Sequence, residues 1–170
     1  MKYPVRTRIL HWLTAVAIFA ALLLGFTMTN IVGSHGMLVA AHMTLGVTIL
    51  VIVIARAANR FTHRTPPLPD TVGPWEAKAV VGSELSLYAL MLAQPLVGWA
   101  MVSAAGMPVR VFGGIVLPRL APLDAELYGI LRQAHSVLAY LLVAVVAAHV
   151  SAVLLHTLTL RDGMLRRMTR

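Results

Sequence analysis

The sequence contains no cysteine among its 170 residues. Disulfides, iron–sulfur clusters, thiolate-ligated haem and covalent haem attachment through a Cys-x-x-Cys-His signature are therefore excluded. Charge is also scarce, because only 12% of the residues are Asp, Glu, Lys or Arg, against about 25% in a typical soluble domain. A chain with so few charges and 59% apolar residues cannot cover itself with a polar shell. The lipid bilayer is its expected solvent.

Four long apolar runs divide the chain. Each is close to the roughly 20 residues that an α-helix needs to cross about 30 Å of hydrocarbon. The pattern predicts a single-domain, all-α membrane protein over residues 1–170, built as a four-transmembrane-helix bundle. The predicted helices cover about residues 9–30, 37–57, 83–105 and 131–158.

The basic residues predict how the bundle lies in the membrane. The net charge is +8, which in a soluble protein would suggest nucleic acid as a partner. Here the basic residues lie at the ends of the apolar runs, where they set topology and contact anionic lipid head groups. We therefore expect no nucleic-acid partner. Only Arg110, Arg119 and Arg132 would lie outside if both termini were cytoplasmic, so the positive-inside rule predicts cytoplasmic termini.

Four of the seven histidines, at positions 11, 42, 135 and 149, fall at membrane depth within the predicted helices, and His156 lies near the end of the last one. An ionisable side chain at membrane depth is costly and usually functional. His135 and His149 are 14 residues apart, which puts them on one helix face about 21 Å apart along the axis. That spacing leaves room for two haem groups stacked through the bilayer. His42 lies at the depth of His135, and His11 lies at the end toward which His149 points. The predicted axial pairs are therefore His42 with His135 and His11 with His149.

Other interpretations of the histidines remain open at this point. By depth alone His156 matches His11 better than His149 does, and it lies on the same face. A spacing of about 31 Å between His135 and His156 would, however, push both irons to the membrane surfaces. We therefore expect His156 to be a surface residue or a contact of a haem propionate. Histidines hydrogen-bonded across helices are a second interpretation. A metal-ion transporter is a third, although Glu84 is the only acid near a span.

Five segments, in order along essentially the whole chain, resemble the bacterial cytochrome b561 family. They are Arg8-Ile9-Leu10-His11-Trp12, His42-Met43-Thr44-Leu45-Gly46, Pro95-Leu96-Val97-Gly98-Trp99, the pair His135 and His149, and Arg161-Asp162-Gly163-Met164-Leu165-Arg166-Arg167-Met168. The resemblance implies a multi-pass protein of the bacterial inner membrane with two b-type haems. It also implies bis-histidine ligation by the same four residues.

The resemblance allows two functions. Some members are similar to superoxide oxidase, which passes electrons from periplasmic superoxide to ubiquinone, and this oxidoreductase activity is our first expectation. Others resemble electron-transfer subunits or partners that link the quinone pool to another redox protein. Two six-coordinate haems imply outer-sphere electron transfer in either case. Arg110, Arg119 and Arg132 would steer superoxide electrostatically, anchor the protein at the lipid interface, or pair with haem propionates.

Overall fold

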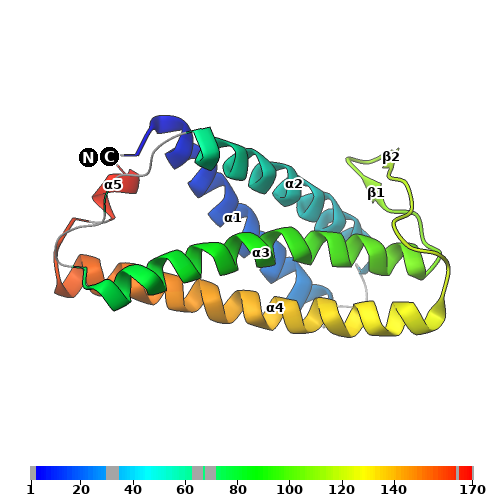
Figure 1. Ribbon diagram of the computed structural model, residues 1–170. Helices are drawn as coiled ribbons and strands as arrows, with labels where there is room; N and C mark the ends of the chain where they lie inside the picture. The colour runs from blue at the N-terminus through cyan, green and yellow to red at the C-terminus, as the bar shows by residue number, and fades with distance from the viewer. Residues whose placement is uncertain (1–2, 30–34, 63–66, 68–71, 164, 170) are drawn as a thin grey trace.

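Four long helices make up most of the chain, and all four are long and apolar enough to cross a membrane. They are α1 (Val5–Met28), α2 (His35–Thr62), α3 (Pro74–Ala104) and α4 (Ala125–Leu154). Contacts join α1 to α2, α2 to α3 and α3 to α4, so the helices form one bundle (Figure 1). The predicted four-transmembrane-helix bundle is confirmed. The structure is a computed structural model that describes residues 3–29, 35–62, 67, 72–163 and 165–169.

The two ends of the bundle carry different additions. After α4 the chain makes one π-helical turn (Leu155–Thr159) and then the short helix α5 (Arg166–Thr169). Between α3 and α4, the strands β1 (Arg110–Val111) and β2 (Ile115–Val116) form an antiparallel hairpin. Figure 1 shows both chain termini at one end of the bundle and the hairpin at the other. We call these the terminal end and the hairpin end.

Polar first turns extend two helices beyond the apolar runs that predicted them. Helix α3 begins at Pro74, whose fixed backbone angle suits the first helical position. The Glu76 carboxylate accepts a hydrogen bond from the Gly73 backbone N–H at 2.9 Å, which satisfies a donor that the helix leaves free. At the start of α4, Asp124 Oδ1 accepts a hydrogen bond from the Leu127 N–H at 2.9 Å.

All four helices contribute to a buried apolar layer across the middle of the bundle. It consists of Ile18 of α1, Ile49 and Val53 of α2, Met91 of α3 and Leu142 of α4. Outward-facing positions also carry large apolar side chains, including Val16 and Leu23. An apolar exterior is unfavourable in water and favourable in lipid, which agrees with a membrane location.

Contacts at each end fix the connections to the bundle. At the hairpin end, the Phe112 N–H donates to Thr44 Oγ1 at 3.3 Å, and Trp99 Nε1 donates to the Pro118 carbonyl at 2.9 Å. At the terminal end, Trp12 Nε1 of α1 donates to the Met168 carbonyl of α5 at 3.2 Å. These bonds hold segments that are distant in sequence against the helices.

Candidate functional site

The structure brings the four predicted histidines together as two pairs. At the terminal end, the His11 ring of α1 faces the His149 ring of α4 with 6.4 Å between ring centroids. Toward the hairpin end, the His42 ring of α2 faces the His135 ring of α4 at 6.2 Å. Within the described residues no three His, Asp or Glu side chains gather as a metal cluster. The arrangement is therefore two separate imidazole pairs.

The spacing of each pair fits one metal ion held between two imidazoles. With metal–nitrogen bonds of about 2 Å and a ring radius of about 1.2 Å, opposed imidazoles have centroids about 6.4 Å apart. Both observed separations agree with that value. In the described part of the chain, Nδ1 of His42 and Nδ1 of His135 are buried without a hydrogen-bond partner. Buried polar atoms are usually paired, so these rings still have unused capacity for a hydrogen bond, and it is the centroid separations that favour a bound metal.

Two glycines allow rings of the hairpin-end pair to lie against a neighbouring helix. A Cβ atom at Gly98 of α3 would lie 2.9 Å from His135 Cε1, and one at Gly25 of α1 would lie 3.3 Å from His42 Cε1. Ordinary carbon–carbon contacts are about 3.5–4.0 Å. Because Gly25 and Gly98 have no side chain, they leave the space that the His42 and His135 rings occupy.

The two pairs lie on opposite sides of the buried apolar layer. Leu142 belongs to that layer and is seven residues from both His135 and His149. Two helical turns, or about 10 Å, therefore separate Leu142 from each histidine along α4. The fold thus offers two cofactor positions at different depths with apolar packing between them.

A sequence profile described as "Prokaryotic cytochrome b561" matches residues 2–170. The chain belongs to the prokaryotic cytochrome b561 family. The resemblance predicted from the sequence is therefore confirmed. Membership makes the protein a b-type haem protein of electron transport and places it in the bacterial inner membrane as a multi-pass protein.

Individual relatives agree with this assignment. The chain is 28% identical to "Probable superoxide oxidase CybB" of Yersinia pestis over 75% of its own length and 72% of that protein. It is 25% identical to "Cytochrome b561 homolog 1" of Escherichia coli over 94% of its own length and 92% of the relative. It is 28% identical to "Cytochrome b561 homolog 2" of Escherichia coli over 98% and 90% of the two lengths.

Two polar side chains that the sequence interpretation missed contact the histidine pairs of this cytochrome b561. Arg56 Nη2 of α2 lies 3.3 Å from His11 Nδ1. Gln94 Nε2 of α3 donates to the His135 carbonyl at 3.1 Å and lies 3.4 Å from His135 Nε2. In the sequence, Arg56 is a basic residue at the end of an apolar run, where such residues commonly mark topology. Gln94, a lone amide inside an apolar run, was a signal that could have been used.

His156 lies apart from the two pairs. It is buried at 7% exposure, and its Nδ1 lies 2.6 Å from Asp162 Oδ2. Arg161 adopts a left-handed backbone conformation with φ of 51°, which turns the chain back so that Asp162 reaches the ring. The prediction that His156 is a surface residue is therefore wrong. The other part of that prediction, a propionate contact, stays open.

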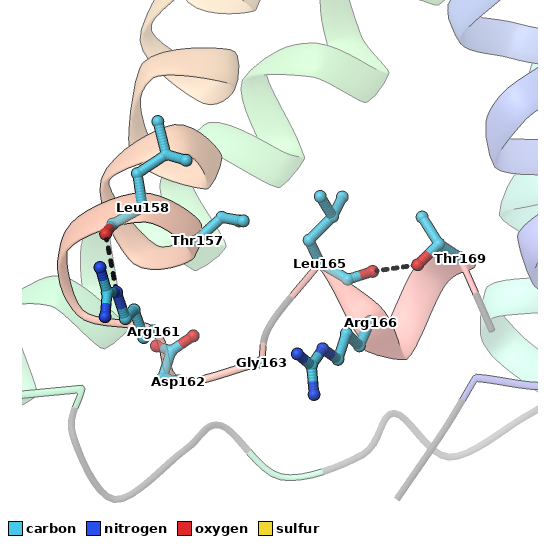
Figure 2. Close-up of a pocket in the computed structure, with 8 residues that line it drawn as sticks. All are labelled: Thr157, Leu158, Arg161, Asp162, Gly163, Leu165, Arg166 and Thr169. Atoms are coloured by element: carbon cyan, nitrogen blue, oxygen red, sulfur yellow. Dashed lines mark hydrogen bonds between the residues drawn. The ribbon is translucent and has the colours of Figure 1, made fainter.

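A cavity of about 670 Å³ lies beside this turn, at the terminal end of the bundle. Figure 2 shows Arg161, Asp162 and Arg166 among its lining residues, and Arg161 Nε donates to the Leu158 carbonyl at 3.4 Å. None of the described residues that line the cavity is a histidine. It is therefore distinct from both histidine pairs.

The three arginines expected on the periplasmic side are all exposed. Arg110 lies in β1, Arg119 follows β2, and Arg132 lies in the second turn of α4. None of them takes part in a salt bridge within the described residues. Their guanidinium groups are therefore available to an anion or to lipid head groups at the hairpin end.

Proposed function

We propose that this cytochrome b561 holds two haem b groups and passes electrons from periplasmic superoxide to ubiquinone. One haem would be held by His11 and His149, the other by His42 and His135. The main support is the pairing of these four histidines at two depths, with centroid separations that suit one metal ion per pair. Arg8 Nε, buried without a hydrogen-bond partner among the described residues, is available to a haem propionate at the terminal end.

The proposed reaction balances with two superoxide anions for each quinone. Each superoxide loses one electron and leaves as O₂, and ubiquinone takes up two electrons and two protons to become ubiquinol. When bound, a haem supplies the one-electron chemistry of its iron. Two of the four histidines would hold each haem. Substrates would then exchange electrons from the edge of the site without binding the metal.

Superoxide would approach at the hairpin end. The positive-inside rule favours cytoplasmic termini, and the hairpin lies at the opposite end of the bundle (Figure 1). The exposed residues Arg110, Arg119 and Arg132 belong to this region. Exposed cations attract an anion over about a Debye length and raise its association rate.

Ubiquinone would approach from the lipid between α1 and α4. An apolar pocket of about 350 Å³ lies there, lined by Phe19 and Leu22 of α1 and by Val146, Ala147 and Val150 of α4, among others. Val150 directly follows His149 in the chain. An apolar pocket beside the terminal-end pair suits a hydrophobic quinone that enters from the membrane.

A second function has its own support. The two Escherichia coli relatives, which carry only a cytochrome name, match over more of both chains than the superoxide oxidase does. In this alternative the chain is a subunit or partner that links the quinone pool to another redox protein. Both functions use the same four histidines, so the electron donor distinguishes them.

Superoxide added to the purified, haem-loaded protein tests the proposal. We expect rapid haem reduction in the visible spectrum, abolished by superoxide dismutase, and one ubiquinol for every two superoxide anions when ubiquinone-1 is present. Absence of haem reduction by superoxide, with ready reduction by ubiquinol, would support the alternative function instead.

A bulky side chain in the apolar pocket distinguishes ubiquinone reduction from haem reduction by superoxide. Ala147→Trp is expected to slow ubiquinol formation at least tenfold and to leave haem reduction by superoxide unchanged. Val137→Trp, at an exposed position of the same helix, is the matched control and should change neither rate. Equal rates of ubiquinol formation in both variants would remove the quinone site from this pocket.

A further inference from the structure

The two histidine pairs differ in the charge beside them. At the terminal-end pair, the Arg56 guanidinium lies 3.3 Å from the His11 ring and its Cζ lies 5.4 Å from the centroid of the Tyr88 ring. Arg56 is half-buried inside the bundle. A cation held there acts through a medium of lower dielectric constant than water, so its field on the pair is strong.

No carboxylate forms a salt bridge with Arg56 in the described part of the chain. The salt bridges there join Arg60 to Glu84 and His156 to Asp162, and neither includes Arg56. The Tyr88 ring has no net charge, so its contact with Arg56 does not neutralise the guanidinium. The terminal-end pair therefore carries a net positive neighbour.

The hairpin-end pair has a neutral neighbour instead. The side chain that contacts His135 is the Gln94 amide. Arg132 lies one turn before His135 on α4, but it is exposed. Solvent screens an exposed charge far more strongly than a half-buried one. The positive potential is therefore greater at His11 and His149 than at His42 and His135.

We propose that Arg56 makes the His11–His149 site the stronger electron acceptor of the two and so gives electron flow its direction. This inference rests on the proposed binding of two haems. A nearby positive charge stabilises the reduced state of a redox site relative to its oxidised state. At an effective dielectric constant of about 20, a unit charge within about 8 Å changes such an equilibrium more than tenfold. Partial exposure reduces this effect, and we take about tenfold.

The direction follows from the placement of the pairs. With a haem at each pair, one electron would leave the haem held by His42 and His135, which becomes oxidised. It would reach the haem held by His11 and His149, which becomes reduced. No bond forms and no proton moves in this step. Arg56 therefore favours transfer from the hairpin end toward the terminal end.

Optical potentiometry of the full haem-loaded chain in detergent tests the role of Arg56. The native protein should show two midpoint potentials. Arg56→Gln should lower only the upper one, by about 59 mV, which is the one-electron equivalent of a tenfold change. Arg56→Lys keeps the charge and should retain most of the upper value. Arg132→Gln removes a basic residue near the other pair and should leave the upper midpoint unchanged.

A variant that lacks one histidine pair shows which midpoint potential belongs to which pair. His42→Ala leaves the pair of His11 and His149, and its single remaining midpoint should be the upper one. The inference is overturned if that midpoint is the lower one, or if Arg56→Gln leaves the upper value unchanged or raises it. If Arg56→Gln does not retain its haem, the assignment from His42→Ala and the value for Arg56→Lys still decide. These measurements use neither superoxide nor quinone, so failure of the proposed substrates leaves them valid.

Discussion

Replacing Gly98 with alanine should remove one haem while leaving the protein folded. The added Cβ would lie 2.9 Å from His135 Cε1, whereas carbon atoms in contact are about 3.5–4.0 Å apart. The His135 ring must therefore move by about 0.6 Å or more. A site of this kind tolerates displacements of about 0.5 Å. We expect loss of the haem at His42 and His135, and a haem content that falls from two to one per chain.

The effect on stability should be small by comparison. Alanine is favoured over glycine inside a helix by about 1 kcal/mol, and overpacking costs about 1–3 kcal/mol. The opposing atom is at the end of a side chain that can rotate, which keeps the overpacking cost near the lower limit. The free energy of unfolding of the polypeptide should therefore change by no more than about 2 kcal/mol.

Haem extraction and quantification per polypeptide is the assay, with thermal unfolding measured in parallel. Gly82→Ala is the matched control, because it lies in the same helix and its Cβ would meet nothing within 4 Å. That variant should keep two haems. If Gly98→Ala also keeps two haems with an unchanged spectrum, His135 is not a haem ligand in its position against Gly98.

Two further predictions concern the ends of α4 and the hairpin end. His149→Ala should lose the terminal-end haem, whereas His156→Ala should retain both haems, as measured by haem content and low-spin absorbance. Loss of a haem in His156→Ala but not in His149→Ala would show that His156 is the ligand. Replacing Arg110, Arg119 and Arg132 together with glutamine should slow superoxide oxidation several-fold and flatten its dependence on ionic strength, measured by stopped-flow absorbance. Unchanged rates at low salt would show that these arginines serve as lipid anchors.

The histidine pairs could be predicted from the sequence because helix geometry is regular. Fourteen residues bring His149 back to the face of His135 whatever the rest of the fold does. His42 and His11 were placed from the helix that each one begins, because the first and second predicted helices start at opposite ends of the bundle. The four-helix bundle followed from the length of the apolar runs.

Features that depend on how the helices are rotated against one another were not predictable. Arg56 and His11 are 45 residues apart and lie on different helices, and no periodicity within one helix specifies their contact. The close approach of Gly98 to His135 is of the same kind. The hairpin of β1 and β2 has strands of two residues each, which are too short for an alternating pattern.

The choice between His149 and His156 shows a limit of counting depth from charges. The π-helical turn at Leu155–Thr159 and the left-handed Arg161 bring Asp162 against His156. A local change of backbone conformation thus gives His156 a different partner. Regular helical geometry does not anticipate such a change.

The haem content of the purified chain tests the central claim most directly. We predict two b-type haems per polypeptide, both low-spin, with one lost in His42→Ala and the other lost in His11→Ala. A colourless protein after expression with ample haem supply would contradict the account, as would two haems retained in either variant.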